Sequence, residues 1–204
     1  MKDFISGMFG AIKRMPYKTK NDAWRPISID SLTHALNVVE YGHHEVHGKS
    51  SYWLNYSKAL ANGNTFTVAL TTPAAAVSTK EGHLTLTVSS TASGTFSVYE
   101  DLTSYSGGTA TTPNNRYRKY QTTNPSVMIS TVRGATGDSP ITLVGGTVIY
   151  SDILLSNKGV VWERRSGEEI ILKSNCKYAF RVVNGVSANT VSIVLDWYEH
   201  SPRD

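Results

Sequence analysis

The sequence predicts an all-β fold, an antiparallel jelly-roll-like β-sandwich with an extended N-terminal arm. Large apolar residues alternate with polar ones in many segments, which is the two-residue period of a strand with one buried face. Turn-forming residues separate about ten such segments, and no interior segment has a convincing helical pattern. A chain of 204 residues that is 40% hydrophobic and 18% charged is also large and apolar enough to bury a core.

The last quarter of the chain carries the clearest strand pattern. Two alternating runs are separated by the turn residues Asn184-Gly185 and by residues 187–189, so we expect them to pair as an antiparallel hairpin. Each large side chain on their shared face should stabilise the fold by about 1.5–3 kcal/mol when it is buried. The seven residues of this face are Tyr178, Phe180, Val182, Val191, Ile193, Leu195 and Trp197.

Residues 1–30 are expected to form an arm and linker, and residues 31–204 the β-sandwich domain. The arm begins with apolar residues at helical spacing, and residues 13–29, with two prolines and mixed charge, predict an extended linker. Residues 1–25 hold six basic and two acidic side chains, which accounts for the whole net charge of +4. The apolar side of the arm packs either against a partner or against its own domain. The predicted partner-binding residues are Phe4, Ile5, Met8, Phe9, Ile12, Lys13 and Arg14.

The charge and hydropathy patterns bear on the kind of partner. The cationic residues are scattered and are not interleaved with stacking aromatics, which disfavours nucleic acid. No apolar run approaches the ~20 residues of a membrane span, and the first 15 residues lack the apolar core of a signal peptide. We therefore expect a soluble protein, without a nucleic-acid or membrane partner, whose arm binds an acidic protein surface.

Strands and turns alternate through the middle of the chain. Residues 43–56 predict one long strand bent near Gly48, and residues 65–72 a strand that Pro73 ends. Residues 103–115 and 131–140 predict polar loops. Residues 116–122 alternate aromatic and charged side chains, which is typical of an edge strand guarded by cations. The remaining strands are expected at residues 84–88, 96–99, 126–132, 141–155 (one strand, or two broken at Gly145-Gly146), 160–164 and 168–172.

The most suggestive polar cluster is His43, Glu45 and His47. On a strand these side chains would share one face, and two histidines with a carboxylate are a ligand set for iron or zinc. Side chains two apart on a strand are rooted ~6.5–7 Å from each other, however, so three of them converge poorly on one ion. We favour a polar network or subunit contact, and expect neither a metal nor another cofactor.

No catalytic motif is evident in the sequence, and we expect the protein not to be an enzyme. The one cysteine, Cys176, cannot form an internal disulfide and is expected to be a buried structural thiol. The neighbouring carboxylates Glu100-Asp101 and Glu168-Glu169 should point to opposite faces of their strands as solvated side chains.

Three stretches resemble a set of tailed-phage structural proteins, the head decoration or auxiliary capsid proteins. They are I-D-S-L-T-H-A-L at residues 29–36, H-H-E-V-H-G-K-S-S-Y at residues 43–52 and L-D-W-Y-E-H at residues 195–200. The resemblance spans about residues 29–200 and carries no catalytic residues. It implies a β-sandwich, often a homotrimer, that binds the major capsid protein and reinforces the outer capsid surface after synthesis in the host cytoplasm. The alternative is a glycan-binding module of a head or tail fibre that uses Trp53, Tyr117 or Tyr120 to stack on sugars.

Overall fold

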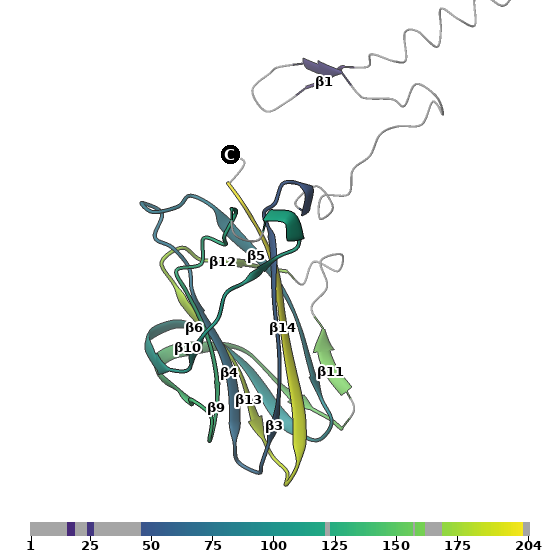
Figure 1. Ribbon diagram of the computed structural model, residues 1–204, viewed down its shortest axis with the longest axis vertical. Helices are drawn as coiled ribbons and strands as arrows, with labels where there is room; N and C mark the ends of the chain where they lie inside the picture. Colours follow the sequence, from purple (N-terminus) through teal and green to yellow (C-terminus); the bar gives the residue numbers. More distant parts are fainter. Residues whose placement is uncertain are drawn as a thin grey trace, which may run out of the picture. The chain divides into compact units, whose positions relative to one another are not determined.

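The structure is a computed structural model, which describes residues 16–18, 24–26, 46–120, 123–156, 158–161 and 169–201 (Figure 1). Its contacts divide the chain into two units, Met1–His43 and His44–Asp204. In the first unit, β1 (Pro16–Lys18) pairs antiparallel with β2 (Trp24–Pro26), within the segment predicted to be an extended linker. The predicted apolar face of the arm lies outside the described residues.

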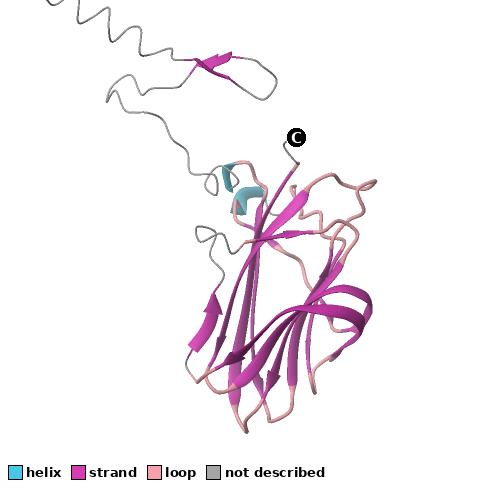
Figure 2. Ribbon diagram, turned by 180° about the vertical axis from the view of Figure 1, so that it is seen from behind, coloured by secondary structure: helices cyan, strands magenta, loops and turns pink. Residues whose placement is uncertain are grey.

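The second unit is built almost entirely of strands, as Figure 2 shows. Its described strands form two antiparallel sheets. The β14 sheet has the order β11-β5-β14-β3-β8, with β12 also paired to β5, and the β13 sheet has the order β10-β6-β13-β4-β9-β7. The strands are β3 (Ser51–Leu60), β4 (Thr65–Thr71), β5 (Glu81–Ser90), β6 (Gly94–Gly107), β7 (Thr109–Ala110), β8 (Asn114–Asn115), β9 (Ser130–Ala135), β10 (Ile141–Leu154), β11 (Lys158–Val161), β12 (Ile170–Leu172), β13 (Lys177–Asn184) and β14 (Asn189–His200).

The order of the strands is that of a jelly roll. Along the chain β3, β4, β5 and β6 alternate between the two sheets, as do β12, β13 and β14, and the first and last strands of the unit, β3 and β14, lie side by side. Two packed antiparallel sheets with this alternation confirm the predicted fold class. No helix in the described part of the chain is long and apolar enough to cross a membrane.

The predicted hairpin between the last two strands is wrong. Strand β13 pairs with β4 and β6 in one sheet, whereas β14 pairs with β3 and β5 in the other. The seven side chains of the predicted shared face are all buried, but they meet across the sandwich from opposite sheets. Alternation shows which side of a strand is buried, and it says nothing about which strand is the hydrogen-bonded neighbour.

A single large core fills the space between the sheets. Trp197, Phe180 and Phe96 are among its fully buried side chains, and both sheets supply alternating residues to it. A second, smaller cluster lies on the outer face of the β13 sheet, because Ala69 points away from the side occupied by its neighbours in the main core. The second cluster consists of Ala69, Leu102, Ile141 and Ala179.

The second cluster exists because β6 and β10 form a long ribbon that bends over the sheet. Residues 103–107 continue β6, where a loop was predicted, and residues 141–154 form one strand. Register shifts between Val144 and Gly145 and between Val148 and Tyr150 mark the bend, which Figure 1 shows in both strands. Asp101 lies opposite this irregularity with a φ of 55°, a left-handed conformation that is uncommon outside glycine.

Further local predictions are wrong, among them the loop at residues 131–140, where β9 occupies Ser130–Ala135. Val46 and His47 form a helical turn, and β3 begins only at Ser51. The predicted edge strand at residues 116–122 is replaced, in its described part, by a short 3-10 helix, η1 (Arg118–Tyr120). The turn at Val46 and η1 both lie outside the described strands, so local hydrogen bonds decide their conformation and the residue pattern does not.

Candidate functional site

The sequence motifs at residues 43–52 and 195–200 meet at one end of the sandwich. Strand β3 pairs with β14 so that Tyr52 lies opposite Trp197 and Ser51 lies opposite Tyr198. The rings of Tyr52 and Trp197 stack with centroids 5.9 Å apart, and both side chains are 1% exposed or less. Tyr52 and Trp197, which are 197 − 52 = 145 positions apart in the chain, therefore build one junction, which we take as the candidate functional site.

Glu199 is the buried carboxylate of this junction, and only 1% of it is exposed. Its Oε1 accepts hydrogen bonds from the Trp197 indole at 2.9 Å and the Ser126 hydroxyl at 2.5 Å, and its Oε2 accepts one from the Val127 amide at 3.0 Å. Burial nevertheless raises the pKa of the carboxyl, because the three donors only partly replace lost hydration. Glu199 thus ties residues 126–127 to the end of β14.

Tyr52 and Asn115 hold the neighbouring loops in the same way. The Tyr52 hydroxyl lies 3.2 Å from the carbonyl of Asn124 and 3.1 Å from that of Pro125. The Asn115 side-chain amide donates to the carbonyls of Lys49 at 2.8 Å and Asn124 at 3.1 Å. A hydrogen bond to a buried group contributes about 0.5–1.5 kcal/mol net, so these contacts order the loops at this end.

The predicted cluster of His43, Glu45 and His47 does not form one strand face. His47 lies in the helical turn, with an exposed side chain whose ring meets that of Tyr117 edge to face at 6.1 Å. His43 and Glu45 lie outside the described residues. Within the part of the chain that the structure describes, no group of three or more His, Cys, Asp or Glu side chains is arranged to hold a metal ion.

Four other polar side chains gather on the outer face of the β14 sheet. His83 on β5 lies beside Tyr198 and His200 on β14, and Glu169, just before β12, reaches the same place. The members of this group come from three separate segments, so no local pattern in the sequence reveals it. The prediction that Glu169 is a solvated side chain is wrong, because its carboxylate accepts hydrogen bonds from both His83 and Tyr198.

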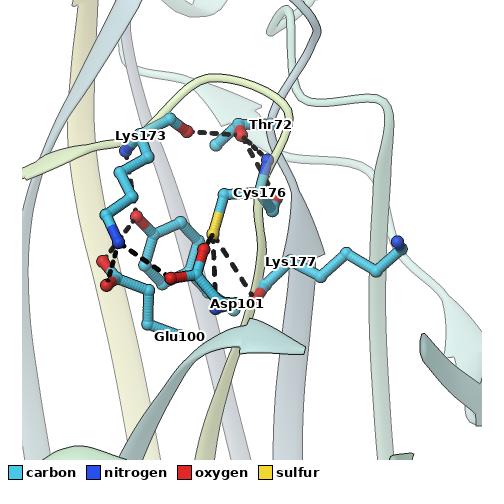
Figure 3. A network of polar contacts seen from close by, with 7 residues as sticks. Thr72, Glu100, Asp101, Lys173, Cys176 and Lys177 are labelled. Atoms are coloured by element: carbon cyan, nitrogen blue, oxygen red, sulfur yellow. Dashed lines mark hydrogen bonds and ion pairs between the residues drawn. The ribbon is translucent and has the colours of Figure 1, made fainter. Parts of the chain in front are cut away.

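A second polar network fixes the bend of β6 (Figure 3). The Lys173 ammonium lies 2.5 Å from the Glu100 carboxylate and 2.8 Å from that of Asp101. Hydrogen bonds from Lys173 hold the pKa of Asp101 below its usual range, and the two carboxylates raise the pKa of Lys173. The expectation that the neighbouring carboxylates point apart is wrong here, since the left-handed backbone at Asp101 turns both toward one lysine.

Cys176 and Tyr178 form the inner part of the same network. The Cys176 thiol donates to the Asp101 carboxylate at 3.2 Å and accepts from the Asp101 amide at 3.4 Å. The Tyr178 hydroxyl donates to Glu100 at 3.0 Å and accepts from the Lys173 amide at 2.9 Å. Burial raises the pKa of the Cys176 thiol, which disfavours the nucleophilic thiolate. These contacts are structural, because each polar atom is engaged in holding the bend.

Three further features bear on partners. A pocket of about 560 Å³ lies between residues 72–82 and β12, with Met128 and Lys173 among its lining side chains. Trp53 and Tyr117, the described candidates for sugar stacking, are both half-buried. Strand β10 ends the β13 sheet and exposes a run of large apolar side chains at its surface: Val144, Val148, Ile149 and Ile153.

The predicted arm residues, Phe4 to Arg14, lie outside the described part of the chain, so their role stays a prediction. Comparison of the chain with protein-family models found no match, and comparison with curated proteins found none either.

Proposed function

We propose that the chain is a non-enzymatic structural protein of a tailed-phage virion, which decorates and stabilises the outer capsid surface. The observation that carries this proposal is the meeting of two of the resembling motifs. They supply Tyr52, Trp197 and Glu199 to one buried junction, where their polar atoms bind neighbouring loops. Motif residues used to build the sandwich suit a protein whose task is to present a stable surface to its partners.

Anchoring to the major capsid protein is assigned to the N-terminal arm. Ordering an arm costs conformational entropy, which burial of Phe4 and Phe9 on a partner would offset. Lys13 and Arg14 add attraction to an acidic surface, which salt weakens.

Self-association, as a homotrimer, is assigned to the body and to a second copy of this chain. The body outside the arm is electrically neutral, so copies do not repel each other through net charge. Strand β10 has a sheet edge that no described strand covers, a single charged residue, Asp152, and exposed apolar side chains such as Ile153 at 66%. Such an edge is suited to pairing with another chain.

Binding to particles that lack the protein tests the anchoring. Full-length chain should bind them, and a variant with both Phe4→Ser and Phe9→Ser should stay folded but lose at least tenfold in affinity. Equal binding by this variant would refute the arm model. Binding of the chain to a glycan array, with no affinity for particles, would favour the glycan-binding alternative.

Sedimentation of the purified protein tests the subunit contact. Ile153→Lys should shift the protein toward monomer, because a lysine on an edge strand opposes strand pairing. Val77→Lys is the matched control, since Val77 is 74% exposed but lies in the loop between β4 and β5. A monomeric wild-type protein would contradict the homotrimer.

A further inference from the structure

We propose that His83 and His200 share one extra proton, and that with Glu169 they form an electrically neutral trio that fastens the end of β14 to β5. This inference stands independently of the proposed function. It rests on a row of hydrogen bonds across the outer face of the β14 sheet, in which each histidine uses both of its ring nitrogens.

The row has acceptors at both ends. His83 Nδ1 lies 2.6 Å from the Glu169 carboxylate, and His200 Nδ1 lies 2.7 Å from the carbonyl of Ser201. The two rings face each other through their Nε2 atoms, which are 2.8 Å apart. The Glu169 oxygen that faces His83 also accepts a hydrogen bond from the Tyr198 hydroxyl at 2.9 Å. Between a carboxylate and an imidazole the imidazole is the stronger base, so the proton of the His83–Glu169 contact lies on His83 Nδ1 and the carboxylate accepts in both contacts.

Counting protons gives the charge of the pair. A carbonyl and a carboxylate accept only, so both Nδ1 atoms must carry hydrogen. The Nε2 to Nε2 contact needs one further hydrogen, since two bare lone pairs would repel at 2.8 Å. Three protons on four ring nitrogens make one imidazole and one imidazolium. The single positive charge balances the Glu169 carboxylate.

A metal ion between the rings would also satisfy the two lone pairs, so zinc is the competing occupant of this contact. Zinc binds histidine nitrogen at ~2.0–2.1 Å in a tetrahedral arrangement, which places two ligand nitrogens roughly 3.3 Å apart. The observed 2.8 Å is typical of a direct hydrogen bond. The described residues also supply no third ligand that would complete a metal site.

The surroundings hold the proton in place. His83 is 8% exposed, and the Tyr198 ring stacks on it with centroids 4.7 Å apart. Around the pair, β14 contributes the Tyr198 hydroxyl, and the segment before β12 contributes Glu169. On β5, Glu81 lies opposite His200 in the register, so a second carboxylate flanks the pair. Glu169 and Glu81 favour a retained positive charge here, and they act against Lys80, which precedes β5 and acts electrostatically at the end of β14.

Loss or gain of a proton removes the hydrogen bond between the Nε2 atoms of His83 and His200. A second extra proton would place two N–H groups against each other, and removal of the first would leave the two lone pairs in contact. The folded pair thus keeps one proton beyond those of two neutral imidazoles. Two histidines in an unfolded chain, with the ordinary pKa of about 6.5, keep two such extra protons in acid and none in base. Stability from this contact is therefore greatest near pH 6.5 and falls on both sides.

Urea unfolding of the full chain between pH 5 and 8.5 tests the proposal, with His200→Gln as the variant and His47→Gln as a control at an exposed histidine. The ratio of the wild-type unfolding constant to that of His200→Gln should have its minimum near pH 6.5. Away from this minimum the ratio should increase in both directions, with a slope that approaches tenfold per pH unit, the slope for one linked proton. The ratio of the wild-type unfolding constant to that of His47→Gln should show no such minimum. A flat or one-sided profile would overturn the proposal.

Two further measurements keep the proposal testable if His200→Gln does not fold. Nitrogen NMR of the wild-type histidines at pH 6.5 should find three protonated nitrogens among the four of this pair, and two would refute the shared proton. Wild-type protein should also melt at the same temperature with zinc chloride and with a chelator. Stabilisation by zinc that His83→Gln abolishes would identify the site as a metal site instead.

Discussion

Tyr178→Phe removes one hydroxyl from the network that fixes the bend of β6. Tyr178 is fully buried, and its hydroxyl joins the Glu100 carboxylate to the backbone amide of Lys173. The ring keeps its place in the core, so the loss is confined to two hydrogen bonds. One of them goes to a charged acceptor, and the other leaves a backbone N–H without its partner.

The expected cost is about 2–3 kcal/mol. A hydrogen bond to a charged group contributes ~1.5–3 kcal/mol, and an unsatisfied donor costs ~1–3 kcal/mol, reduced here because the Lys173 amide is only partly buried. With a urea dependence of about 2–3 kcal/mol per molar, the midpoint of unfolding should fall by roughly 1 M. Tryptophan fluorescence follows the transition, since Trp197 lies in the core.

Tyr105→Phe is the matched control. The Tyr105 hydroxyl makes one neutral hydrogen bond, to Thr71 at 2.8 Å, on the outer face of the β13 sheet. Its loss should cost about 0.5–1.5 kcal/mol. If Tyr178→Phe cost no more than Tyr105→Phe, the claim that the Lys173 network holds the bend would be refuted.

Three other outcomes are expected. Leu86→Ala should lower the free energy of unfolding by about 2–5 kcal/mol, because it leaves a cavity in the main core, whereas Val77→Ala should change it by less than ~0.5 kcal/mol; calorimetry compares them. The raised pKa of Glu199 means that the folded carboxyl binds a proton more readily than the unfolded one, so the wild type should gain stability relative to Glu199→Gln as the pH falls from 7 toward 4.5. Cys176 should react with a thiol reagent at pH 7.5 at least tenfold more slowly in native protein than in urea, because burial raises its pKa and blocks access.

The candidate site was only partly predictable. The motif at residues 195–200 contains Trp197, Glu199 and His200, and its alternation correctly assigned Trp197 to the core. No local sequence pattern predicts that His200 contacts His83, which is 117 positions away, or that His83 contacts Glu169. The histidines at residues 43–47 are close in sequence, which predicted that they share one strand face. His47 lies in a helical turn, so its side chain is not on a strand face.

The sequence by itself determined that the body is a β-sandwich and which side chains fill it. Burial of one face imposes a two-residue period, so the alternation around Phe180 and Leu195 specified the inward side of each strand. Only the tertiary structure decided that β13 and β14 belong to opposite sheets, that β6 bends at Asp101, and that His83 meets His200. Strand pairing depends on hydrogen bonds between backbones, which are alike at almost every residue. The choice of partner therefore follows from how the whole core packs, and a local pattern cannot contain it.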